Sequence, residues 1–161
     1  MTVTLLRIRA AAETNLKKFN ASVRRGPYTQ GMNALRNLLP LTGRVLFALI
    51  FIAAAPRHFT NEGISHAAEL GIPFANLLVP ISGILAIAGG LSVATGFHAK
   101  FGALALTLFL VPVTLGMHQF WNIHDPAKQH IQFAMFGKNI SMLGAAICLA
   151  YNGSGPFSLR R

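Results

Sequence analysis

Acidic side chains are nearly absent from this sequence, which has 4 Asp and Glu residues against 14 Lys and Arg. Charged residues make up 11% of the chain, whereas soluble proteins contain about 25%. A soluble domain of this size needs a polar surface, which so few charges cannot supply. Because 53% of the residues are hydrophobic and the mean hydropathy is +0.50, the composition predicts a membrane protein.

Cysteine is also scarce, since Cys148 is the only one and lies in an apolar run. A single cysteine excludes an internal disulfide and a Cys-x-x-Cys redox pair. The sequence lacks a Gly-x-Ser-x-Gly elbow, a Walker loop and paired carboxylates, so it predicts no catalytic residue of these kinds. His118, His124 and His130 are six residues apart, which does not match a helical metal pair, and we expect no metal.

Long apolar runs dominate what is present. We predict four membrane-spanning helices over residues 40–57, 74–97, 101–121 and 131–151. The last three runs reach the roughly 20 residues needed to cross hydrocarbon. The first run is shorter, so its helix must include flanking residues to reach that length. The predicted fold class is all-α, a four-helix transmembrane bundle with a basic amphipathic tail at its amino end.

The predicted tail covers residues 1–37, and the predicted transmembrane domain covers residues 38–161. Apolar residues recur in the tail at intervals of three and four: Leu5, Ile8, Ala12, Leu16, Phe19 and Val23. Basic residues fall between them, a pattern typical of an amphipathic helix at a membrane surface. Gly26, Pro27 and Gly31 are expected to break the tail, and Pro40 is expected to begin the first span.

The basic residues predict the orientation. Eleven of them fall on one side of the predicted spans, in the tail, at Arg44 and Lys100 and at the carboxyl end, while Arg57, Lys128 and Lys138 fall on the other. The positive-inside rule then places both termini in the cytoplasm. We expect a multi-pass protein of a bacterial cytoplasmic (inner) membrane, with lipids and other membrane subunits as partners and no nucleic acid.

Small side chains predict how the helices pack, because close approach replaces the hydrophobic effect inside a membrane. One stripe lies on the second predicted span and contains Ser82, Ala86, Gly90 and Ala94. A second stripe lies on the fourth span and contains Gly137, Ser141 and Ala145. We expect these two stripes to form the tightest helix pair.

An ordered set of short motifs resembles the DoxX family of small four-helix membrane proteins over about residues 40–159. The motifs are Leu41-Thr42-Gly43-Arg44, Gly71-Ile72-Pro73, Gly89-Gly90, Val111-Pro112-Val113-Thr114, His118-Gln119-Phe120-Trp121, Lys138-Asn139, Leu143-Gly144 and Gly155-Pro156-Phe157-Ser158-Leu159. Many DoxX relatives carry a Glu where this chain has Ala86, so a role for that charge does not transfer. The resemblance implies a redox-linked membrane protein associated with quinone.

Lys138 is the most informative polar residue of the predicted spans. It lies about 10 Å into an apolar run at 1.5 Å per helical residue, where a charge needs a partner. The predicted topology brings His58, His118 and Trp121, with Arg57, to the same outward half of the bundle. Alternatives are that Lys138 reaches the interface along its own stem and that Trp121 belongs to an interfacial aromatic belt.

Two hypotheses follow for function. The first is an accessory or structural subunit of a larger redox or energy-converting membrane complex, with the basic tail docked at its cytoplasmic face. The second is a quinone-binding subunit in which His58, His118, Trp121 and Lys138 line a headgroup site. A quinone is the only cofactor that the sequence suggests, and whether the chain is an enzyme stays open.

Overall fold

The computed structural model describes residues 12–22 and 27–159. Over these residues the chain is all-α and no strand occurs, which confirms the predicted fold class. Four helical stretches are long and apolar enough to cross a membrane: Ala34–Phe59, Ala75–Thr95, Ala99–Asn122 and Pro126–Asn152. The chain is therefore an integral membrane protein with four spans.

The chain divides into two compact units, Met1–Leu39 and Pro40–Arg161. In the first unit, residues 12–22 form a helix whose side chains are all exposed. Leu16 and Phe19 are 60% and 64% exposed, so this helix has apolar side chains that the described residues leave largely uncovered. The predicted tail residues Leu5, Ile8 and Val23 lie outside the described part of the chain.

The first span is formed by α2 (Pro27–Ala54) and the short 3-10 helix η1 (Ala55–Phe59). The prediction that Pro40 begins this span was wrong, because α2 starts at Pro27 and continues through Pro40. Proline suits the first turn of a helix, and inside a membrane helix it is tolerated where neighbouring groups satisfy the freed carbonyl. The expected break at Gly31 is likewise absent from α2.

A short helix, α3 (Asn61–Glu69), follows η1 and leads into the second span, α4 (Ala75–Thr95). Thr60 caps α3, since its hydroxyl accepts a hydrogen bond of 3.1 Å from the backbone N–H of Gly63. α4 ends at Gly96, whose φ of 76° requires the left-handed conformation that glycine adopts without strain.

The third span contains α5 (Ala99–Met117) and the 3-10 helix η2 (Phe120–Asn122), and the fourth is α6 (Pro126–Asn152). α6 begins five residues before the predicted start of its span at residue 131. Asp125 explains the earlier start, because its carboxylate accepts hydrogen bonds from the N–H groups of Ala127 and Lys128 at 2.9 and 3.0 Å.

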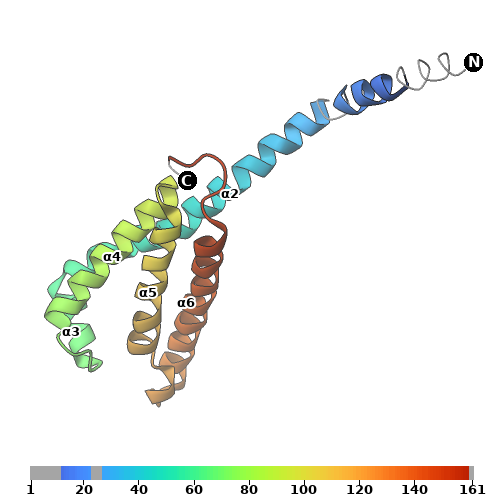
Figure 1. Cartoon of the computed structure of the whole chain (residues 1–161). Coiled ribbons are helices and arrows are strands. Elements are labelled where there is room, and N and C mark those ends of the chain that lie inside the picture. Colours follow the sequence, from blue (N-terminus) through green and yellow to red (C-terminus); the bar gives the residue numbers. More distant parts are fainter. Residues whose placement is uncertain (1–11, 23–26, 160–161) are drawn as a thin grey trace, which may run out of the picture. The chain divides into compact units, whose positions relative to one another are not determined.

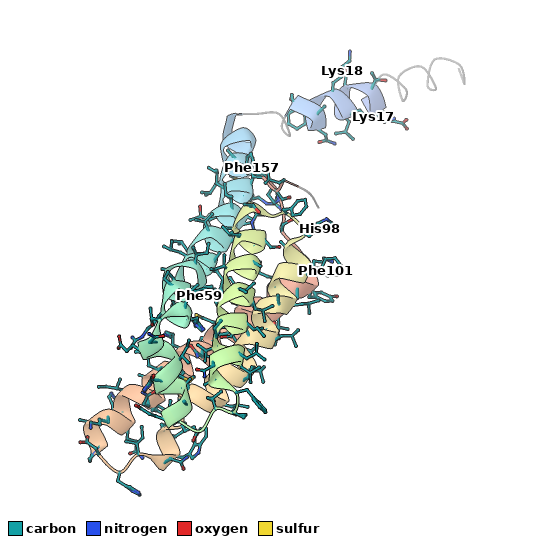
Figure 2. The ribbon with its side chains drawn as sticks, turned by 90° about the vertical axis from the view of Figure 1, so that its left-hand side faces the viewer. Lys17, Lys18, Phe59, His98, Phe101 and Phe157 are labelled. Carbon is teal, nitrogen blue, oxygen red and sulfur yellow. The ribbon has the colours of Figure 1, made fainter. Side chains whose placement is uncertain are left out.

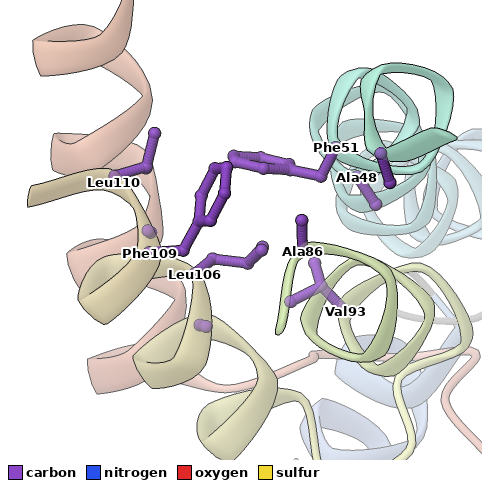
Figure 3. Close-up of a cluster of buried hydrophobic side chains, with 10 residues drawn as sticks. Ala48, Phe51, Ala86, Val93, Leu106, Phe109 and Leu110 are labelled. Atoms are coloured by element: carbon purple, nitrogen blue, oxygen red, sulfur yellow. The ribbon is translucent and has the colours of Figure 1, made fainter. Parts of the chain in front are cut away.

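α5 lies between α4 and α6 (Figure 1), and it contacts both along their lengths. Side chains of α2, α4 and α5 meet in a buried apolar cluster (Figure 3). The rings of Phe51 and Phe109 meet edge to face there, with centroids 6.0 Å apart. Leu106 and Ala86 are almost fully buried beside them, so the centre of the bundle is held by interlocking side chains from these helices.

The prediction of the tightest helix pair was wrong. Gly90 of the α4 stripe faces α2, because a Cβ there would lie 3.0 Å from the Ile52 side chain. α4 approaches α5 through a different residue, Gly89, where a Cβ would lie 2.9 Å from the Leu106 side chain. The α6 stripe faces none of these helices, since a Cβ on Gly137 would meet no atom within 4 Å. Both stripes consist of small residues, and the sequence alone does not reveal which neighbour each one meets.

Candidate functional site

Arg44 is the most deeply buried charged side chain in the described part of the chain, with 1% of its surface exposed. Its guanidinium donates hydrogen bonds to the carbonyl oxygens of Ser154, Pro156 (3.3 Å) and Phe157 (2.8 Å). Arg44 therefore fastens the segment after α6 to the start of the first span. This role was not predicted, although an arginine four residues into a predicted span was a signal for it.

The Arg44 contacts also join two of the sequence motifs. One is Leu41-Thr42-Gly43-Arg44 near the start of the first span, and the other is Gly155-Pro156-Phe157-Ser158-Leu159 after α6. A Cβ on Gly155 would lie 3.3 Å from Cβ of Pro40, so the two segments are in close contact. The beginning and the end of the four-helix unit hence lie at the same end of the bundle. This agrees with the predicted even number of spans, while the compartment that this end faces stays a prediction.

His58 lies in η1 and is half-buried against α4 and α5. Its Nδ1 forms a hydrogen bond of 2.8 Å with the hydroxyl of Ser82, which itself donates to the Val79 carbonyl at 2.7 Å. The His58 ring also lies 5.7 Å from the Phe109 ring, measured between centroids. Because its polar and apolar contacts are both internal, His58 ties the end of the first span to its neighbours.

His118 and Trp121 lie at the junction of α5 and α6. His118 Nδ1 forms a hydrogen bond of 2.8 Å with Oε1 of Gln132, so it links the loop to the first turns of α6. Trp121 is 50% exposed, and its ring lies 5.1 Å from that of Phe120 and 6.0 Å from that of Phe136. These contacts make an aromatic cluster at this end of the bundle.

A pocket of about 360 Å³ opens beside this cluster, and we call it the aromatic pocket. Its lining consists of Phe120, Pro126, Gln129, His130 and Phe133. The pocket offers two aromatic faces together with an imidazole and a carboxamide, which can stack on a flat ring and bond to its oxygens. None of the four residues predicted for the quinone site lines it.

Lys138 is exposed on α6, and its ammonium lies 3.5 Å from the Met135 sulfur. α6 has 27 residues, or about 40 Å at 1.5 Å per residue, so its polar first turn extends beyond the roughly 30 Å hydrocarbon layer. The depth of Lys138 in the membrane stays a prediction. A thioether is a weak acceptor, so this contact does not satisfy a charge within the membrane.

The structure does not bring the four predicted quinone residues into mutual contact. Within the described residues, no hydrogen bond or ring contact joins any two of His58, His118, Trp121 and Lys138. Their partners are Ser82, Phe109, Gln132, Phe120, Phe136 and Met135. The predicted quinone site therefore stays a prediction. Within residues 12–22 and 27–159, no three His, Cys, Asp or Glu side chains lie close enough to hold a metal ion.

One side of α6 has no neighbour in the described structure, and we call it the open face of α6. It consists of Gly137, Lys138, Ser141, Gly144, Ala145 and Cys148, which are all exposed. Only 11% of the most apolar stretch of α6 is buried, against 33% for the third span. Cβ atoms placed on Gly137 and Gly144 would meet no atom within 4 Å, so the backbone of α6 is accessible along this face.

Asp125, which caps α6, has a perturbed pKa. The backbone N–H of Lys128, together with that of Ala127, holds the pKa of Asp125 below its ordinary value. Asp125 lies before α6 begins, whereas Lys138 lies three turns into the helix. The acid is thus committed to the helix cap and gives the lysine no ion pair.

Comparison with known proteins gives a family and two named relatives. The sequence profile of the SURF4 family matches residues 3–161. The inner membrane protein YphA of Escherichia coli K12 is 28% identical over 130 residues, which cover 80% of this chain and 92% of YphA. The inner membrane protein YqjF of the same strain is 28% identical over 138 residues, covering 81% and 95%. No solved structure matches.

These matches support the predicted family in part. A small integral membrane family was expected and is supported; the profile that matches is that of SURF4, and the matches do not show DoxX specifically. The expected resemblance began near residue 40 and left the basic tail outside. The SURF4 profile includes the tail from residue 3 onward, so the tail is part of what the chain shares with its family.

Proposed function

Because this chain belongs to the SURF4 family and spans a membrane four times, we propose that it is an accessory subunit of a larger complex in a bacterial inner membrane. The names of YphA and YqjF, two inner membrane proteins, support the location. The observation that carries the proposal is the open face of α6, where small residues and an unsatisfied lysine lie together in a membrane-spanning helix.

The small residues of the open face suit a partner helix. Gly137, Ser141, Gly144 and Ala145 allow two helix backbones to approach closely, which is how helices associate in lipid. A lipid chain gains nothing from such a groove, because the surrounding hydrocarbon is equally apolar. The face therefore fits a second membrane helix better than it fits bulk lipid.

Lys138 indicates which side chain the partner helix should carry. A lysine within the membrane is stabilised by a carboxylate at hydrogen-bond distance. The four acids of this chain are Glu13, Glu62, Glu69 and Asp125, and none lies in a span. A second copy of the same chain cannot supply the carboxylate. The proposed partner is a different membrane protein that carries an Asp or Glu within one of its spans.

Native electrophoresis of mild-detergent membrane extracts tests this proposal. The wild-type chain of 17.3 kDa is expected to migrate with a larger partner species. Gly137→Leu fills the groove and Lys138→Met removes the charge, so both should release the chain as a small species. Migration of the wild-type chain alone, or only with copies of itself, would contradict the proposal.

Matched controls separate loss of docking from loss of folding. Gly43 is a second glycine in a span at which a Cβ would meet no atom within 4 Å, so Gly43→Leu makes the same change on a different helix. Lys128→Met removes a lysine outside the apolar part of α6. Both controls should keep the partner species, and a loss equal to that of Gly137→Leu would show a general effect of bulk.

A second candidate function is quinone binding, and the aromatic pocket favours it. Its volume of about 360 Å³ lies within the range of small-molecule sites, about 300–1,000 Å³. Phe120 and Phe133 can stack on a quinone ring, while His130 and Gln129 can bond to its oxygens. A quinone bound in this pocket would lie near His118 and Trp121, two of the predicted residues, and away from His58.

Quinone content after mild extraction tests this candidate. We expect His130→Ala with Phe133→Ala to lower the quinone retained per chain, while His58→Ala leaves it unchanged. Lys138→Met tests the site predicted from the sequence in the same assay. Quinone that is absent from the wild-type preparation, or unaffected by every one of these variants, would remove the candidate.

A further inference from the structure

A pocket of about 440 Å³ opens where α5 begins and α6 ends, and we call it the headgroup pocket. Residues 98–101 line one side, and residues 152–156 line the other. It lies at the far end of α6 from the aromatic pocket, which is lined by the first turns of that helix. Neither proposed function uses the headgroup pocket.

Lys100 supplies the pocket with a positive charge. Its side chain lies across Gly153, since a Cβ placed on that glycine would be 3.0 Å from Cε of Lys100. No ion pair involves Lys100 in the described part of the chain. His98 adds ring nitrogens to the lining. The amino end of α5, which is the positive end of its dipole, also lies at the pocket.

The charge balance of the four-helix unit favours an anion in this pocket. The three acids of that unit are Glu62 and Glu69 in α3 and Asp125 before α6, and all three belong to the opposite end of the bundle. Arg44, which is also basic and lies near this end, is already bonded to backbone carbonyls. The described lining of the pocket thus presents the ammonium of Lys100 and includes no Asp or Glu side chain.

The rim of the pocket is apolar and aromatic. Phe101, Tyr151 and Phe157 are 70%, 83% and 59% exposed. Figure 2 shows His98 and Phe101 pointing away from the helices at the end of the four-helix unit where Phe157 lies. Exposed aromatic rings mark the level of the headgroups at a membrane surface. A ligand with both a phosphate and acyl chains would use the cationic lining and this rim together.

We propose that the headgroup pocket binds the phosphate of an anionic phospholipid, with Lys100 as its main charged contact and His98 as a second donor. The acyl chains would extend along the apolar rim into the bilayer. Free inorganic phosphate would use the lysine but leave the rim unoccupied. The lipid is therefore the expected source of the phosphate, and it would fix the α4–α5 turn and the segment after α6 to the membrane surface.

Native mass spectrometry of the full-length chain tests the proposal. The protein in mild detergent is titrated with dioleoyl phosphatidylglycerol, dioleoyl phosphatidylcholine or inorganic phosphate. We expect one phosphatidylglycerol to bind most tightly to the wild type. Lys100→Gln should weaken that site about tenfold, the effect of losing one hydrogen bond to a charged group. Phosphatidylcholine and inorganic phosphate should bind more weakly than phosphatidylglycerol.

Two further variants keep the result interpretable. Lys100→Arg keeps the charge and should keep the site, which also shows that a change at this position is compatible with folding. Lys128→Gln removes a lysine at the other end of α6 and should have no effect. The basic tail can also attract anionic lipid, but it is the same in every variant and cancels in the comparison.

Three results would overturn the proposal. The first is equal binding of phosphatidylglycerol by the wild type and Lys100→Gln. The second is equal loss in Lys100→Gln and Lys128→Gln, which would show a general response to net charge. The third is a site filled equally well by inorganic phosphate, which would make the ligand a free anion. None of these results bears on the open face of α6, so the accessory-subunit proposal is tested separately.

Discussion

Arg44 and Lys138, two of the basic residues within the described spans, differ in the partners of their charged groups. Arg44 is 1% exposed and bonds to three carbonyl groups of the segment after α6. Lys138 is exposed, and its hydrogen bond within the described residues is to a methionine sulfur. Arg44 has its partners inside the four-helix unit, whereas the partner that we propose for Lys138 comes from outside it.

This difference separates residues that stabilise the bundle from residues that are available for binding. The side of the bundle around Arg44, His58 and Gly89 is closed by hydrogen bonds and close contacts. The open face of α6 has small residues with no neighbour in the described structure. A substitution on the closed side should change folding, and one on the open face should change association.

Arg44→Leu should have the largest effect on stability. It removes the donors for three carbonyls, and a buried hydrogen bond to a charged group contributes about 1.5–3 kcal/mol. We expect a loss of about 3 kcal/mol or more in denaturation followed by circular dichroism. Faster proteolysis within residues 153–159 should accompany it, because Arg44 holds that segment.

Arg57→Leu is the control for that experiment. Arg57 pairs with Glu62 at 3.1 Å, but the two side chains are 69% and 80% exposed. Exposed ion pairs contribute about 0–1 kcal/mol, so this variant should remain close to the wild type. Equal losses for Arg44→Leu and Arg57→Leu would contradict the internal role of Arg44.

Gly89→Leu and Gly137→Leu compare how tightly the closed side and the open face are packed, through their effects on the free energy of unfolding. A Cβ on Gly89 would lie 2.9 Å from the Leu106 side chain and 3.0 Å from the Gly102 carbonyl oxygen. Overfilling such a contact costs about 1–3 kcal/mol. Gly137→Leu should leave the unfolding free energy of the isolated chain unchanged, so a large loss there would show that the open face is packed.

Ser82→Ala should have a smaller effect, about 1 kcal/mol, because it removes the hydroxyl bonded to His58 Nδ1 at 2.8 Å. Ser141→Ala is the matched change on the open face, where the hydroxyl bonds only to the preceding turn of its own helix, at the Gly137 carbonyl. Thermal denaturation of the two variants side by side measures the difference. An identical midpoint for both would break the distinction between the closed side and the open face.

Asp125→Ala should have the smallest effect, a slight lowering of the thermal midpoint, because Asp125 is an exposed cap. Its pKa is lower in the folded chain, so its stabilising contribution is complete above the ordinary carboxyl pKa. The contribution is lost as the pH falls through that value to the lowered folded pKa. The wild type and Asp125→Ala should therefore converge in acid, and divergence there would contradict the assignment.

The four spans were predictable from sequence because crossing hydrocarbon demands long apolar helices whatever their neighbours are. The errors in the predicted helix starts occur where a local sequence signal is compatible with two structures. Pro40 can begin a helix or be tolerated within one, and α2 extends through it. Asp125 and Pro126 carry a capping signal that was overlooked, because the fourth span was delimited by hydropathy alone.

The candidate site was less predictable than the fold. Lys138 could be singled out from the sequence, since its position in an apolar run is a one-dimensional property, but its need for a partner stays a prediction. The partners of His58 and His118 were not predictable, because Ser82 and Gln132 are brought to them only by packing between helices. The headgroup pocket likewise combines residues 98–101 with residues 152–156, which are adjacent only in the folded chain.

The sequence by itself determined that this chain is a membrane protein, how many times it crosses the membrane and which charged residues lie within apolar runs. Those properties depend on the free energy of each segment in hydrocarbon, which is a sum along the chain. Only the tertiary structure decided which charge is satisfied, because pairing depends on neighbours. It placed Arg44 against carbonyls more than a hundred positions away and left Lys138 on an open helix face.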